Sequence, residues 1–179
     1  AHYDHLGTMG KKTFFPGAND NASGIAMLLV LAEHFKKNPP HCTVVFLAFS
    51  GEELGLLGSQ YFVQKPMVDL RSVKFLINLD LVGNGDEGIT VVNGSIYQVY
   101  FNKLIEINDE AKLLPKIKQR GESCNSDHCP FYRKGVPSFF IYAMEGTKAY
   151  HDAGDRMDSL TYAGFNGLTK LLSGFSEGF

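Results

Sequence analysis

The sequence predicts an α/β fold in which a mixed central sheet is covered by helices on both faces. Short runs of β-branched and aromatic residues alternate along the chain with segments of helical periodicity, which is the pattern of such a sheet. The 179 residues are 44% hydrophobic and 20% charged, as expected of one globular domain with a single sizeable core. We therefore expect one domain over residues 1–179.

Three apolar runs have the length of buried strands, at residues 43–49, 73–79 and 137–142. The first run is apolar at nearly every position, so we expect it to lie centrally in the sheet with both faces covered. Each run is followed by a polar or Gly-rich loop. Polar side chains at strand ends can converge from distant parts of the chain, and we expect the chemistry of the protein to lie there.

Helices are expected over about residues 22–37, 95–111 and 158–175, where apolar residues recur at helical spacing. Pro39 and Pro40 end the first of these segments. The two later segments carry no cluster of chemically reactive side chains, and we assign them to core packing.

Composition excludes several classes of partner. Seventeen basic and nineteen acidic residues leave a net charge of −2 without a long basic run, so nucleic acid is not an expected partner. The chain also contains no apolar run of the roughly 20 residues that a membrane span requires, and no segment typical of a signal peptide. Cys124 and Cys129 are close enough to form a disulfide, but two reduced thiols are about equally plausible.

Carboxylate and imidazole side chains recur in five loops. They are His2 and Asp4 in AHYDHLG, Asp20 in GANDNASG, Glu52 and Glu53 in FSGEELG, Asp80 in INLDLVG, and His151 in YHDAGD. These residue types hold catalytic zinc, which activates water when one coordination position stays open. The set predicts a metal-dependent hydrolase.

Taken singly, most of these residues have an ordinary alternative interpretation. Glu52 and Glu53 would form a solvated turn, and Asp20 is about equally well placed to cap the following helix. Asp80 differs, because a carboxylate this close to an apolar strand is expected to be paired or metal-bound. Two adjacent acids point in different directions, so one can bind metal while the other acts as a base.

Together the motifs AHYDHLG, GANDNASG, FSGEELGLLGS, NLDLVG, SDHCPF and YHDAGD resemble those of the co-catalytic two-zinc aminopeptidases of the bacterial leucyl aminopeptidase type, which are related to glutaminyl cyclases and glutamate carboxypeptidases. The resemblance implies a three-layer sandwich with a mostly parallel sheet. It also implies that Asp20 bridges two zinc ions, that His2 and Asp80 complete one site, and that Glu53 and His151 complete the other.

The resemblance further implies that Glu52 is the general base and that Asp4 orients His2 through the second ring N–H. The loop residues Ser126, Asp127 and His128 match a family loop that lies beside the site, for positioning or for substrate contact. The expected reaction is hydrolysis of the N-terminal residue from a peptide with a free N-terminus.

Relative to that family the leading strand before His2 is absent, so we expect an N-terminally truncated domain. Two zinc ions per chain are expected, and one would remain if this terminal position left His2 poorly held and its site disordered. Two alternatives stay open: a glutaminyl cyclase-like acyltransferase with a single zinc, and a non-catalytic binding domain of the same fold. The resemblance also favours a secreted or periplasmic protein.

Overall fold

The computed structural model describes residues 1–144 and 149–179. Its main sheet has the order β3-β6-β4-β5, formed by Leu76–Leu79 (β3), Ser138–Ala143 (β6), Ile89–Val92 (β4) and Ile117–Gln119 (β5). The β3–β6 and β4–β5 pairs are parallel, while β4 and β6 are antiparallel. The predicted mixed, mostly parallel sheet is confirmed.

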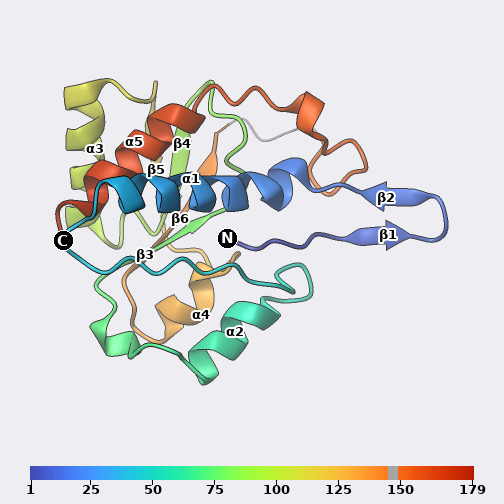
Figure 1. The fold of residues 1–179 in the computed structure, drawn as a ribbon, viewed down its shortest axis with the longest axis horizontal. Coiled ribbons are helices and arrows are strands. Elements are labelled where there is room, and N and C mark those ends of the chain that lie inside the picture. Colours follow the sequence, from blue (N-terminus) through green and yellow to red (C-terminus); the bar gives the residue numbers. More distant parts are fainter. Residues whose placement is uncertain (145–148) are drawn as a thin grey trace.

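Helices cover both faces of this sheet, as predicted (Figure 1). One face carries α1 (Ser23–Lys37), α3 (Gln98–Ala111) and α5 (Phe165–Ser176), whose buried residues join those of the strands in the larger core cluster. The other face carries α2 (Leu57–Gln64) and α4 (His128–Arg133), which contribute to a second, smaller cluster.

Strand β6 places side chains on both faces of the sheet. Its side chains alternate between the faces of the sheet. Phe139 and Ile141 belong to the larger cluster, whereas the ring of Phe140, between them in sequence, packs 5.5 Å from the ring of His128 in α4. The buried strand therefore separates α4 from the helices of the opposite face.

The predicted helix over residues 22–37 and the strand over residues 137–142 agree with α1 and β6 to within a residue or two. The last helix begins later than predicted, at Phe165 instead of residue 158. A short 3₁₀ helix, Met157–Ser159, comes first, and Tyr162 then adopts a positive φ of 56°. Because a left-handed residue cannot continue a right-handed helix, α5 starts after it.

The prediction of a central strand over residues 43–49 was wrong. Within the described residues its regular pairing is limited to a single parallel bridge between Phe49 and His2, and Val45 is 52% exposed. A cavity of about 670 Å³ lies between this segment and β3, lined by side chains that include Phe46 and Ile77. An apolar run becomes a strand only when a neighbouring backbone supplies its hydrogen bonds.

A two-stranded hairpin was not predicted. Gly7–Met9 (β1) and Thr13–Phe15 (β2) pair antiparallel and project away from the rest of the molecule (Figure 1). The hairpin is mostly exposed and begins at Gly7, the last residue of the AHYDHLG motif. In the described part of the chain, no helix is both long enough and apolar enough to cross a membrane.

Candidate metal centre

Asp20 lies in the segment Ala18–Ala22, immediately before α1. Asn21, and not Asp20, caps the helix: its Oδ1 accepts the N–H of Gly24 at 2.9 Å, and its Nδ2 donates to the carbonyl of Leu79 at 2.9 Å. The peptide bond between Asp20 and Asn21 is cis. Asn21 therefore has the capping role that was considered for Asp20, and the Asp20 carboxylate faces histidine side chains instead.

The backbone of this segment is held by Asp155, a residue that the sequence analysis did not single out. The Asp155 carboxylate, 1% exposed, accepts the N–H of Asn19 at 2.9 Å and that of Asp20 at 3.0 Å. The one signal in the sequence was its place in YHDAGD, four residues after His151. Asp155 thus links the loop of His151 to the loop of Asp20.

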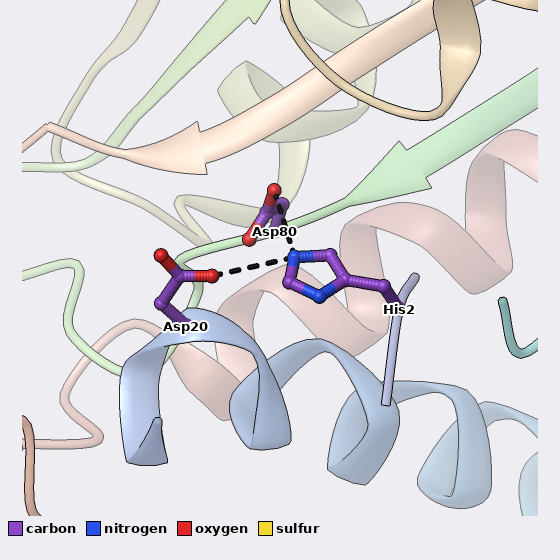
Figure 2. A group of neighbouring side chains, drawn as sticks. All are labelled: His2, Asp20 and Asp80. Atoms are coloured by element: carbon purple, nitrogen blue, oxygen red, sulfur yellow. Dashed lines mark ion pairs between the residues drawn. The ribbon is translucent and has the colours of Figure 1, made fainter. Parts of the chain in front are cut away.

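His2, Asp20 and Asp80 come together from three separate parts of the chain (Figure 2). Nε2 of His2 lies 3.3 Å from Oδ1 of Asp20 and 3.5 Å from Oδ2 of Asp80. All three residues are buried, and neither His2 Nε2 nor Asp80 Oδ1 has a hydrogen-bond partner among the described residues. Buried, unpartnered ligand atoms that converge in this way fit a bound cation.

The group that orients His2 differs from the prediction. Its Nδ1 lies 2.8 Å from the backbone carbonyl oxygen of Asp4 and can donate to it, whereas we expected the Asp4 carboxylate in this role. That carboxylate instead accepts from the hydroxyl of Ser50 at 2.8 Å and from the N–H of Gly51 at 2.7 Å. Asp4 therefore orients His2 through its backbone, because the turn before Glu52 occupies its side chain.

His2 is also held more firmly than expected. The N–H of Phe49 donates to the carbonyl of Ala1 at 3.0 Å, and the N–H of Tyr3 donates to the carbonyl of Phe49 at 2.9 Å. These bonds lie on either side of His2, whose side chain is 1% exposed. The case in which His2 is poorly held and its zinc is lost therefore finds no support in the structure.

Glu53 and His151 form a second group with Asp20. Nε2 of His151 lies 3.2 Å from Oδ2 of Asp20 and 3.1 Å from Oε2 of Glu53. His151 has a positive φ of 53°, an uncommon conformation for a residue other than glycine that often marks a functional position. The five residues predicted as ligands are thus brought together at one centre.

His5 is a further member of this centre that the sequence analysis missed. Its Nδ1 lies 2.8 Å from Oε1 of Glu53 and 3.8 Å from Oδ1 of Asp20. The signal available was a second histidine in AHYDHLG, three residues after His2.

The electrostatics of the centre favour a cation. Burial lowers the pKa of His2, but the nearby carboxylates of Asp20 and Asp80 more than offset this effect and raise the pKa to about 11. Burial, reinforced by four carboxylates, raises the pKa of the Tyr150 hydroxyl to about 12. Such a field stabilises positive charge, and a donor set of imidazoles and carboxylates suits zinc.

The charges of this centre also act on Glu52, although its carboxylate is not among the converging ligand atoms. Burial raises its pKa to about 7, the charge of His2 lowers it, and Asp80, Asp127 and Glu53 raise it further. A carboxyl group whose pKa lies near neutrality is suited to exchanging protons.

The residues Ser126, Asp127 and His128 are all buried. The hydroxyl of Ser126 accepts from Nδ2 of Asn78 at 2.8 Å and donates to Oδ2 of Asp80 at 3.0 Å. Nε2 of His128 donates to the carbonyl of Ser123 at 2.8 Å. This geometry favours positioning over substrate contact, at least for Ser126.

Cys124 and Cys129, which flank this loop, form a disulfide with their Cα atoms 4.8 Å apart. The sequence had left this pairing open. The bridge joins the start of the loop to α4, so the segment that contains Ser126 is closed at both ends.

Comparisons with known proteins agree with this arrangement. Residues 1–176 match the profile of Peptidase family M28. The chain is 31% identical over 169 residues to Aminopeptidase YwaD of Bacillus subtilis, covering 90% of this chain and 36% of that protein. It is 31% identical over 187 residues to a probable leucine aminopeptidase of Arthroderma otae, covering 98% of this chain and 52% of that protein.

Among solved structures, BSAP, a zinc aminopeptidase from Bacillus subtilis, superposes with a TM-score of 0.81 at 26% identity, over 97% of this chain and 43% of that one. The chain thus spans between about a third and a half of the length of these relatives. Because the family profile matches nearly all of it, the chain belongs to Peptidase family M28, as its six motifs predicted.

Proposed function

We propose that this chain forms the catalytic centre of a zinc-dependent aminopeptidase in which Asp20 bridges two zinc ions. The observation that carries the proposal is the placement of the two Asp20 carboxylate oxygens. Oδ1 faces His2, and Oδ2 faces His151. A carboxylate whose oxygens face two different histidines is arranged to serve two cations at once.

In this proposal His2 and Asp80 complete one site, and Glu53 and His151 complete the other. Zinc, when bound, lowers the pKa of a water molecule and polarises the carbonyl group of the substrate. Glu52 takes the proton from the attacking water and returns it to the amine that leaves. The pKa of Glu52 near 7 suits both transfers.

The carboxylates of the centre also support the choice of an exopeptidase. The protonated α-amino group of a peptide is a cation, and it would be attracted by the same field that raises the pKa values of His2 and Tyr150. Binding of that group would restrict cleavage to the first peptide bond. Both curated relatives described above are named aminopeptidases.

The Cys124–Cys129 disulfide supports the proposed secreted or periplasmic location. Disulfides persist in oxidising compartments and are rare in the cytosol of most organisms.

The test combines metal content with hydrolysis. Zinc per chain is measured on protein purified without added metal, and the release of a chromogenic group from an aminoacyl substrate is assayed with and without a chelator. Near two zinc ions and chelator-sensitive release would support the aminopeptidase. One zinc ion with little hydrolysis would favour a glutaminyl cyclase-like reaction, and protein without zinc would favour a binding domain.

A further inference from the structure

The side chain of His5 is buried beside the carboxylates of the metal centre. It is 5% exposed. One ring nitrogen of His5, one oxygen of Asp20 and one oxygen of Glu53 all lie within 4.8 Å of one another. Ligand atoms of His2, Asp20 and Asp80 also lie within 4.8 Å of one another, and the family motifs assign these residues to metal binding.

The contact between His5 and Glu53 does not have the alignment of a hydrogen bond. Nδ1 of His5 lies 2.8 Å from Oε1 of Glu53, yet both atoms are without a hydrogen-bond partner within residues 1–144 and 149–179. Nε2 of His2 likewise lies close to Asp20 and Asp80 and has no hydrogen-bond partner among the described residues. Ligand atoms directed at a common ion approach one another in this way without bonding to each other.

The backbone leaves room for the imidazole of His5. Gly17 adopts a positive φ of 64°, and a Cβ at that position would lie 2.7 Å from the Cβ of His5. On another side the ring of His5 meets that of His151 edge-on, with 5.7 Å between centroids. Its position is therefore determined by packing on both sides.

We propose that His5 binds, through Nδ1, the metal ion held by Asp20 and Glu53. The inference rests on the proposed function, since it adds a ligand to one of its two sites. At that site His5 faces Oδ1 of Asp20 and Oε1 of Glu53, whereas His151 faces the other oxygen of each carboxylate. The site would then have four protein ligands, Asp20, Glu53, His5 and His151, and the other would have three, His2, Asp20 and Asp80.

The two sites consequently differ in role. A zinc site with four protein ligands is closed and structural, whereas one with three keeps a position for water or substrate. In this proposal the open position falls at the site of His2 and Asp80, because that site has three protein ligands. The ion beside His5 is therefore the more tightly bound of the two, and it holds Asp20 in place for the other.

The experiment compares His5→Ala and His5→Asn with an exposed control, His41→Asn. Zinc affinity is measured by titration against a competing chelator, and the visible absorption of the cobalt-loaded protein reports the ligand set. Loss of outer-sphere partners already costs about 10–100-fold in metal affinity. Loss of His5 should therefore weaken one site at least ~100-fold and change the cobalt spectrum, while the control matches the wild type.

The His5→Asn variant distinguishes a His5 that binds the metal from a His5 that only contacts Glu53. An Asn amide nitrogen can stand where Nδ1 stands and donate to Glu53, but it is a poor zinc ligand. If His5→Asn keeps both wild-type zinc affinities and the wild-type cobalt spectrum, the proposal is overturned. Failure of the wild-type protein to bind two zinc ions would instead refute the proposed function.

A measurement on the wild-type protein does not depend on the folding of a variant. In ¹⁵N-histidine-labelled protein loaded with ¹¹³Cd, the proposal expects metal–nitrogen coupling at Nδ1 of His5. Absence of that coupling, with coupling present at His2 and His151, would also overturn it.

Discussion

The buried carboxylate of Asp155 accepts the backbone N–H of Asp20 at 3.0 Å, although the two residues are 135 positions apart in the sequence. Its second oxygen accepts the N–H of Asn19 at 2.9 Å. The loop that contributes one proposed ligand, His151, therefore also sets the backbone position of another.

Asp155→Asn should weaken zinc binding and destabilise the fold. An amide offers one acceptor oxygen, so its NH₂ group would face one of the two backbone N–H donors. Leaving a buried donor unpaired costs about 1–3 kcal/mol. Zinc titration and denaturant unfolding measure the two effects, and the exposed Asp158→Asn is the matched control. Wild-type zinc affinity in Asp155→Asn would contradict the positioning role.

Glu52→Gln and Glu53→Gln should separate proton transfer from metal binding. Glu52→Gln removes the base but none of the proposed ligands, so it should retain zinc and lose most turnover, on the order of 10²–10⁴-fold. Glu53→Gln should lose zinc from one site. Metal analysis and steady-state kinetics on both proteins provide the measurement, and equal metal loss in the two variants would refute the division of roles.

Ser126→Ala should act through Asp80. The substitution removes the hydroxyl that joins Asn78 to Asp80 and leaves two buried polar groups without that partner. We expect a loss of about 1–3 kcal/mol in unfolding free energy and weaker zinc binding at the His2 site. The exposed Ser95→Ala should change neither quantity. If Ser126→Ala raised KM alone, direct substrate contact would be the better interpretation.

The pH dependence of hydrolysis should follow Glu52. Its pKa is about 7 in the metal-free protein, and nearby zinc ions favour the charged carboxylate. A base acts only when deprotonated, so kcat/KM should fall as the pH drops, with a midpoint below about 7. A pH profile of kcat/KM with saturating zinc tests this expectation, and a rate that increases in acid would exclude Glu52 as the base.

His128 should make the fold sensitive to acid. Burial lowers its pKa, whereas in the unfolded chain its pKa is about 6.5. Below that pH the unfolded state binds a proton that the folded state does not, so stability decreases as the pH falls. His128→Gln keeps a donor for the Ser123 carbonyl and does not titrate. Urea unfolding of the metal-free proteins should show a smaller loss of stability in acid for His128→Gln, and parallel pH curves would contradict this account.

Several elements could be predicted because their signals are local. The periodicity of residues 22–37 and the Pro39, Pro40 pair that follows predict α1, and the apolar run at residues 137–142 predicts β6. Asp80 could be recognised because a carboxylate directly after a buried strand requires a partner. The motifs also supplied the five ligand candidates, since their residue types and order are properties of the chain itself.

Other features depend on what lies across the fold. Residues 43–49 have strand composition, but a strand requires a paired backbone, and along most of this segment the described residues supply none. A role for His5 could not be predicted from its local sequence, because it depends on contacts with Gly17 and Glu53 that only the fold creates. Asp155 could not be connected to Asp20 from spacing, because their contact spans 135 residues.

The sequence by itself determined which residue types are present for a metal centre, in which order they occur, and which segments can bury an apolar face. Only the tertiary structure decided that Asn21 caps α1 while the carboxylate of Asp20 faces two histidines, and that a backbone carbonyl of Asp4, and not its side chain, orients His2. The physical reason is that helical periodicity and strand composition act within one segment, whereas ligand geometry depends on distances between segments, and these exist only once the core has packed.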